Sequence, residues 1–163
     1  MPDADTSQDR AGAGPEPRGP APIVELDLAE CHEIIVQQRM CVIAMVDGGA
    51  PYAVPVYYGF DGTTMYLGVA EGRKTRALDA DPRVHIIITE TGDGDRWRSV
   101  AIAGRATTLS EGPERTRGIE VLIAHNRRPE RLAALGGAPP PQRRRGGRIL
   151  RIDEAVITGR ARR

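Results

Sequence analysis

The sequence predicts a mainly β protein with a few helices, folded as a six-stranded antiparallel barrel with the helices packed at its ends. Three observations point to this class. Apolar and polar residues alternate over short segments, tight turns such as Asp61-Gly62 join neighbouring segments, and strands and helices do not follow a βαβ order. Hairpin links imply antiparallel pairing. A doubly wound dinucleotide-binding fold is disfavoured further because the GxGxxG motif is absent.

The first half of the chain predicts one helix and three strands. Asp27 can cap a helix that ends near Gln38, because Glu30 follows three residues later and completes a capping box. Three strands joined by turns follow, over residues 40–46, 52–58 and 64–69. In the second of these strands, four residues at alternate positions are expected to share one face: Tyr52, Val54, Val56 and Tyr58.

The second half predicts two helices and three strands. A short helix over Thr75–Ala80 stops before Asp81-Pro82. The later elements are strands over residues 84–89 and 97–109, a helix over residues 113–126 and a closing strand over residues 148–158. Gly104 marks a bulge or bend within its strand. His85 stands in a run of valine and isoleucine, so we predict a core histidine there.

Composition excludes several classes of protein. A net charge of +1 gives no reason to expect a nucleic-acid partner, and an aromatic content of 4% leaves too few rings for a single-strand stacking platform. Cys31 and Cys41 lack the spacing of a metal site or a redox motif, so we expect free thiols in a cytoplasmic protein. The first 22 residues contain no apolar run, which predicts neither a signal peptide nor a membrane anchor.

Two segments are predicted to lie outside the packed fold. Residues 1–22, rich in Gly, Ala and Pro, are expected to form a disordered tail, and residues 127–147 a flexible loop that carries the basic run Arg143–Arg145. Residues 23–163, with that loop included, are expected to form one domain.

One turn indicates a phosphate site. The predicted strand that ends at Val69 leads into Gly72, two cations at Arg73 and Lys74, and a short helix. A helix N-terminus offers free N–H groups and partial positive charge, and the two side chains add full charges. We call Gly72-Arg73-Lys74 the phosphate turn; an ordinary solvated turn is the alternative.

Several short motifs follow one another in a fixed order. They are Glu30-Cys31, residues 54–62, residues 66–74, Asp81-Pro82, residues 97–100, residues 104–106 and residues 151–160. Over residues 26–160 this order resembles the flavin-binding split-barrel proteins related to pyridoxamine phosphate oxidase, and it is most similar to their nitroimidazole-resistance branch. The resemblance implies a split barrel and a homodimer with two FMN molecules, each at the subunit interface.

Carried over by position, the resemblance assigns FMN contacts to four groups of residues. The isoalloxazine would run beside Val54, Pro55, Val56 and Tyr57. The same ring system and the ribityl chain would lie against Leu67, Gly68, Val69 and Ala70. The phosphate would be held by Gly72, Arg73 and Lys74. Trp97, Arg98 and Ser99 would approach from the neighbouring strand or from the other subunit.

The residue types agree with this assignment at two positions. Pro55 lacks an N–H and belongs on a strand edge, so its segment is expected to be unpaired on one side, where a ligand can sit. Gly68 within a strand suggests that something approaches the backbone closely, and the isoalloxazine is one candidate, with a simple bulge as the alternative.

The sequence also departs from the nitroimidazole-resistance branch, whose members often carry a histidine where this chain has Leu67-Gly68-Val69. We therefore assign no catalytic residue. Flavin performs hydride chemistry itself, so a missing protein acid is compatible with a reductase. Arg98 or Arg105 is a candidate for stabilising a reduced flavin or an acidic substrate, with a surface role as the alternative.

Three functional hypotheses remain open at this point. The first is an FMN-dependent oxidoreductase acting on a small organic acceptor, such as a nitroaromatic or quinone-like compound. The second is a deazaflavin-dependent reductase of the same fold, for which Arg143–Arg145 is a weak hint. The third is a non-enzymatic flavin- or haem-binding protein, in which His32 or His125 would be the haem ligand.

Overall fold

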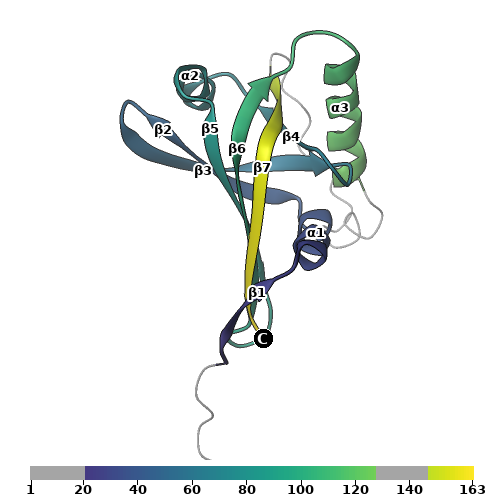
Figure 1. The fold of residues 1–163 in the computed structure, drawn as a ribbon. Coiled ribbons are helices and arrows are strands. Elements are labelled where there is room, and N and C mark those ends of the chain that lie inside the picture. Colours follow the sequence, from purple (N-terminus) through teal and green to yellow (C-terminus); the bar gives the residue numbers. More distant parts are fainter. Residues whose placement is uncertain (1–20, 128–146) are drawn as a thin grey trace, which may run out of the picture.

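The computed structural model describes residues 21–127 and 147–163, which form an antiparallel sheet closed on itself, with three helices around it (Figure 1). The strands are β1 (Ile23–Leu26), β2 (Met40–Asp47), β3 (Ala50–Phe60), β4 (Met65–Val69), β5 (Arg83–Thr91), β6 (Trp97–Thr108) and β7 (Arg148–Arg162). The helices are α1 (Leu28–Gln37), α2 (Arg73–Ala80) and α3 (Pro113–Asn126). The predicted tail and most of the predicted loop lie outside the described residues.

The predicted barrel is confirmed. The strand order is β1-β7-β4-β3-β2-β5-β6, and β6 also pairs with β7, so the six strands β2 to β7 close into a ring. The seventh strand, β1, was not predicted. It has only four residues, three of them exposed, and it exists because it pairs with the last residues of β7, from Gly159 to Arg162.

The last strand holds the two ends of the barrel together. One edge of β7 pairs with β6 along most of its length. Its other edge pairs with β4 over residues 148–151 and with β1 over residues 159–162. No described strand pairs with that edge between these two stretches. Beyond the closed ring, β5, β6 and β7 run on together toward β1 and the C-terminus (Figure 1).

Strand alternation decides which side chains enter the barrel. Val56 and Tyr58 are buried, and Tyr52 and Val54 pack against the same core, so the predicted common face of this strand is confirmed. The prediction that His85 lies in the core was wrong. His85 is exposed, because its neighbours Val84 and Ile86 take the inward positions of β5 and the period of two turns His85 outward.

Specific contacts attach α1 and α3 to the barrel. The capping box of α1 is confirmed, since the Glu30 N–H donates to the Asp27 carboxylate at 2.8 Å and the Asp27 N–H donates to Glu30 at 3.0 Å. At the other end of α1, the buried Tyr58 hydroxyl donates to the Ile35 carbonyl at 2.7 Å. Helix α3 lies directly on Gly59, where an added Cβ would stand 2.7 Å from the Leu122 Cα.

Two further findings concern the described residues. Both cysteines, Cys31 and Cys41, are buried and free. None of the helices in these ranges combines the length and the apolar character needed to cross a membrane.

Candidate functional site

The phosphate turn forms where β4 gives way to α2. Gly72 has a φ of 151°, which favours glycine, and its N–H donates to the Thr75 hydroxyl at 3.0 Å. Arg73 and Lys74 are the first two residues of α2, so the helix begins two residues earlier than the sequence suggested. The helix N-terminus and the two cations are therefore brought to one point, as predicted.

The two cations of the turn are not equivalent. The Arg73 Nε lies 2.6 Å from the Asp47 carboxylate, and its guanidinium lies over the Tyr52 ring, 4.1 Å from the centroid. The hydrogen bond to Asp47 raises the pKa of Arg73. Lys74 is half-buried and has no ion-pair partner among the residues that the structure describes. Lys74 is therefore the cation of the turn whose charge is not already paired with a described carboxylate.

The acidic groups around α2 have their own partner. Arg148 of β7 donates from Nε to Glu71 at 2.7 Å and from Nη1 to Asp79, so it bridges both ends of the helix. The bond from Arg148 lowers the pKa of the Glu71 carboxyl, with a further contribution from Thr75. Arg148 therefore offsets one of these two negative charges, and neither carboxylate forms an ion pair with Lys74.

An open strand edge begins beside this turn. Strand β3 pairs with β2 over residues 50–57, but it pairs with β4 only over residues 58–60. The other edge of residues 50–57 has no described strand on it. The sequence predicted from Pro55, which has no N–H, that this segment is unpaired on one side, and that prediction is confirmed. Backbone N–H and C=O groups at such an edge are available to a ligand.

The strand residues assigned to the flavin differ in what they expose. Val56, Leu67 and Val69 are buried with their side chains in the barrel, and Val54 packs against the same core, so these four can offer mainly backbone. The other four expose at least part of their surface: Pro55, Tyr57, Gly68 and Ala70.

The backbone of Gly68 faces helix α3 of the same chain. A Cβ at this position would stand 3.6 Å from Leu122 Cδ1 of α3. The close backbone approach that the sequence suggested at Gly68 occurs at Gly59 instead, and the approaching element there is α3.

The remaining assigned residues lie at the opposite end of the molecule. Trp97 and Ser99 begin β6, next to β1 and the C-terminus, whereas Ala106 near the other end of β6 bonds to Pro82 just beyond α2 (Figure 1). At about 3.3 Å per residue, the nine steps along the strand from Trp97 to Ala106 span roughly 30 Å. One protomer therefore does not bring Trp97 and Ser99 to the phosphate turn.

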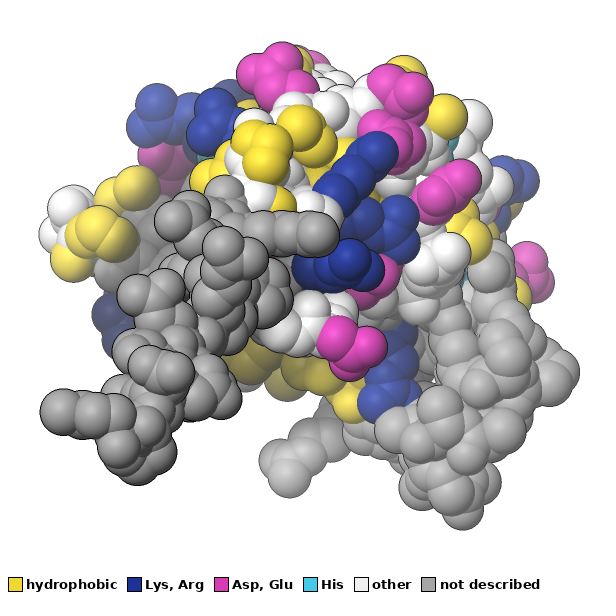
Figure 2. Space-filling view, turned by 90° about the horizontal axis from the view of Figure 1, so that it is seen from below, with side chains coloured by type: hydrophobic (Ala, Val, Ile, Leu, Met, Phe, Trp, Pro, Cys, Tyr) yellow, Lys and Arg dark blue, Asp and Glu magenta, His cyan; other side chains and the backbone are white. Residues whose placement is uncertain are grey.

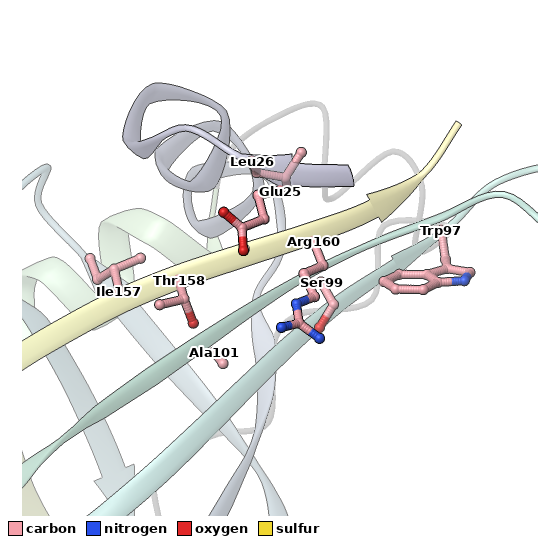
Figure 3. Close-up of a pocket in the computed structure, with 9 residues that line it drawn as sticks. Glu25, Leu26, Trp97, Ser99, Ala101, Ile157, Thr158 and Arg160 are labelled. Atoms are coloured by element: carbon pink, nitrogen blue, oxygen red, sulfur yellow. The ribbon is translucent and has the colours of Figure 1, made fainter. Parts of the chain in front are cut away.

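Trp97 and Ser99 line a hollow of about 470 Å³ on the outer side of the sheet (Figure 3). We call it the β1–β6–β7 hollow. It is lined by Glu25, Leu26, Trp97, Ser99, Ala101, Ile157, Thr158, Gly159 and Arg160. Sequence reasoning missed Glu25, Thr158 and Arg160 as site residues. Only the strand register, which pairs Arg160 with both Ser99 and Glu25, brings them together.

Charges at this end are mixed, as Figure 2 shows for the molecule seen from below. Most arginines there are paired: Arg162 with Asp95, Arg163 with Glu30, and Arg98 with Glu90 and Glu33. Arg98, a candidate for contact with flavin or substrate, is therefore held by two carboxylates. Arg160 has no ion pair within the described ranges.

The family model described as pyridoxamine 5'-phosphate oxidase matches residues 27–161. The chain belongs to this family. The match spans all the described strands except β1 and the last residue of β7, and it includes the phosphate turn and the part of the β1–β6–β7 hollow that β6 and β7 line. The predicted resemblance is thus confirmed at the level of the family.

Solved structures agree with this membership. A FAD-binding protein from Mesorhizobium loti is 27% identical, with a TM-score of 0.65, and the match covers 85% of this chain and 97% of that one. A protein named for 5-nitroimidazole antibiotic resistance, from Bacteroides thetaiotaomicron, is 19% identical, with a TM-score of 0.66 and coverage of 86% and 87%. At that identity the second match shows the fold alone.

Two other proteins match over a smaller part of their own length. An uncharacterized protein of Rhizobium meliloti is 28% identical over 80 residues, which are 49% of this chain and 53% of that protein, so the match spans about half of that relative. A haem-binding protein from Mycobacterium smegmatis is 19% identical, with a TM-score of 0.58 and coverage of 78% and 55%.

Neither candidate haem ligand reaches the hollow or the phosphate turn. His125, in the last turn of α3, is buried, and its Nε2 lies 2.8 Å from the Gln38 carbonyl oxygen. His32 of α1 packs its ring edge-on against Phe60, with the centroids 5.6 Å apart.

Proposed function

We propose that this member of the pyridoxamine 5'-phosphate oxidase family is an FMN-dependent oxidoreductase of the cytoplasm that acts on a small organic acceptor. The observation that carries the proposal is the phosphate turn, where half-buried Lys74 stands at a helix N-terminus without a carboxylate partner among the described residues. The open edge of β3 lies nearby. A relative of 27% identity that is named as FAD-binding supports a flavin.

The residues of this chain fit the phosphate and the polar edge of a flavin. Lys74 and the first N–H groups of α2 would hold the phosphate, with Arg73 sharing its charge between Asp47 and the ligand. The free backbone edge at Pro55 to Tyr57 would fix the polar side of the isoalloxazine. When bound, the flavin supplies the hydride chemistry, and the protein supplies orientation and exclusion of water.

We further propose that the protein acts as a homodimer and that each flavin contacts both copies. Trp97 and Ser99 stand roughly 20–30 Å along β6 from Ala106, which lies at the end nearer the phosphate turn. They can approach a flavin held at that turn only if a second copy supplies them. The family resemblance favours the same arrangement.

An apolar face of the barrel suits the second copy. Register partners place Pro55, Val42, Ile87 and Ala101 side by side across β3, β2, β5 and β6. They share the outer side of the sheet, because the inward positions of these strands belong to the core. Four large side chains on the same outer surface are markedly exposed: Met40, Val42, Val46 and Val156. Such a continuous apolar patch is typical of an interaction surface.

The cofactor is tested first by the colour of the purified protein. Yellow protein with the absorbance of oxidised flavin, or colourless protein that takes up added FMN in one-to-one ratio, is the expected result. If the protein does not bind FMN but binds a deazaflavin, the deazaflavin-dependent reductase replaces this proposal. Steady-state oxidation of NAD(P)H with a nitroaromatic or quinone acceptor then tests for enzymatic activity.

The observations favour a flavin over haem in this chain. A haem needs an axial ligand that faces a cavity. His125 is turned toward the Gln38 carbonyl, and His32 packs on Phe60. A Soret band in the purified protein would contradict this preference.

A further inference from the structure

The β1–β6–β7 hollow owes its shape to small residues between larger ones. Along β6, alternate residues put Trp97, Ser99 and Ala101 on the same side of the sheet. Thr158 stands beside Ala101, and Arg160 stands beside Ser99. Because Ser99 and Ala101 are small, the outer face of the sheet beside Trp97 is left uncovered (Figure 3). A volume of about 470 Å³ is within the range of small-molecule sites.

Arg160 provides the hollow with an available positive charge. Its register partner on β1 is Glu25, so the two side chains leave the same side of the sheet. Nevertheless, no ion pair within 4.0 Å joins Arg160 to Glu25 or to any other described carboxylate. Figure 3 shows the Glu25 carboxylate across β7 from the Arg160 guanidinium, which lies next to Ser99.

The other polar groups of the hollow suit the same kind of ligand. The guanidinium binds a carboxylate with two parallel hydrogen bonds, and the hydroxyls of Ser99 and Thr158 can donate to further oxygens. The half-buried indole of Trp97, diagonal to Arg160 across the strand pair, gives an aromatic surface within about 7–8 Å. An aromatic ring can pack on it.

We infer that the β1–β6–β7 hollow binds a planar aromatic anion, with its acidic group on Arg160 and its ring against Trp97. The binding inference rests on the hollow alone. We also infer that such an anion is the electron acceptor of the enzyme. This second step rests on the proposed function, because the acceptor can be reduced only if the second copy places a flavin beside the hollow.

The only tryptophan of the chain is Trp97, so its indole N–H gives a single reporter signal in a nitrogen-15 NMR spectrum. The full chain is titrated with benzoate, and with uncharged benzamide as the matched ligand. We expect saturable movement of the Trp97 signal by benzoate, with a dissociation constant of roughly 0.1–10 mM for so small a ligand. Benzamide is expected to bind at least about tenfold more weakly, since it lacks the charge.

Variants separate the role of Arg160 from a general effect of charge. Arg160→Gln is expected to weaken benzoate binding about tenfold, whereas Arg83→Gln, an exposed arginine at the end of β5 next to α2, leaves it unchanged. Ala101→Leu fills the floor of the hollow and is expected to abolish binding, which keeps the test valid if Arg160→Gln folds poorly. Equal shifts by benzoate and benzamide, or full binding by Arg160→Gln, would overturn the inference.

The same titration with saturating FMN distinguishes this inference from the proposed function. Benzoate binding with no uptake of FMN would leave the hollow as a ligand site and refute the flavoprotein. FMN uptake without benzoate binding would support the flavoprotein and refute the ligand site in the hollow. If FMN abolishes benzoate binding, the hollow holds the flavin itself, and a separate site for an aromatic anion is refuted.

Discussion

The guanidinium of Arg73 donates a hydrogen bond to the carboxylate of Asp47, with Nε and Oδ2 2.6 Å apart. The bond joins the first residue of α2 to the end of β2, where the turn into β3 begins. One of the two cations of the phosphate turn is therefore already neutralised by the protein. An anion at this turn competes with Asp47 for Arg73 but finds no such competitor at Lys74.

Removal of the competing carboxylate is expected to strengthen FMN binding. An exposed ion pair is worth about 0–1 kcal/mol, so Asp47→Asn should raise the affinity by up to about fivefold. Quenching of FMN fluorescence on titration measures the affinity. Asp81→Asn is the matched control, since it breaks a similar pair with Arg83 at the far end of α2. A loss of affinity in Asp47→Asn would mean that Asp47 positions Arg73 for the phosphate instead.

Lys74 is expected to contribute more to binding than its neighbours. A charge-assisted bond is worth about 1.5–3 kcal/mol, so Lys74→Ala should weaken FMN binding by about tenfold to a hundredfold. Arg76→Ala removes an exposed cation from the same helix and should change the affinity little, which controls for net charge. A Lys74→Ala variant that holds FMN as tightly as the parent contradicts the phosphate assignment.

Local patterns predicted most of the fold. The period of two in residues 52–58 identified the buried face of β3, and the capping box of Asp27 and Glu30 identified the start of α1. The same period was overlooked at His85, where a continuous apolar run suggested burial although every second residue of β5 faces outward. Strand β1 carries too little local signal, because its partner on β7 lies more than a hundred residues away.

The candidate site was predicted only in part for a related reason. The phosphate turn is contiguous in sequence, so its charges and its helix could be recognised together. The β1–β6–β7 hollow joins Glu25, Ser99 and Arg160 from three distant segments, and their meeting depends on the strand register. No local pattern encodes that register.

The packing of α3 on β3 gives a prediction about stability. A Cβ at Gly59 would stand 2.7 Å from backbone atoms of Leu122, which cannot move aside without displacing the helix. Gly59→Ala is therefore expected to lower the free energy of unfolding by about 1–3 kcal/mol. Gly68→Ala is the matched control, because its Cβ would meet the Leu122 side chain at an ordinary 3.6 Å.

Urea denaturation of the two glycine variants measures the difference. Equal stability of Gly59→Ala and the parent would show that α3 can shift without cost. A larger loss in Gly68→Ala than in Gly59→Ala would contradict the packing described for Leu122.

Asp61 makes stability depend on pH. Partial burial alone raises the pKa of its carboxyl, but bonds from Arg117, Thr64 and Thr63 outweigh burial and hold that pKa well below its usual range. Because the folded pKa is the lower one, Asp61 stabilises the fold above about pH 4, and the contribution is lost as pH falls toward the folded pKa.

The substitution Asp61→Asn is expected to cost about 1–2 kcal/mol near neutral pH. The difference from the parent should shrink progressively below about pH 4, where Asp61 begins to be protonated in the unfolded chain. Urea denaturation across this range checks both statements, with Asp93→Asn, in an exposed turn, as the control. A difference that is constant with pH would contradict the role of the ionised carboxylate.

The apolar outer face of the barrel predicts how the proposed homodimer can be broken. Val42 is 42% exposed in the single chain and lies beside Pro55 and Ile87 on that face. A charge buried unpaired in an interface costs several kcal/mol, so Val42→Glu should weaken dimerisation by about a hundredfold or more. Sedimentation velocity over a range of concentrations measures the association. Ile123→Glu, 41% exposed on α3, is the control and should leave the dimer intact.

Dimer loss has a second consequence that links assembly to the cofactor. If a second copy supplies Trp97 and Ser99 to each flavin, Val42→Glu should lose FMN affinity although it leaves Lys74 and Arg73 unchanged. FMN titration of this variant, with its thermal unfolding measured to verify the fold, tests that link. A monomeric Val42→Glu that binds FMN like the parent would confine the flavin site to one protomer, and Trp97 would then have no part in it.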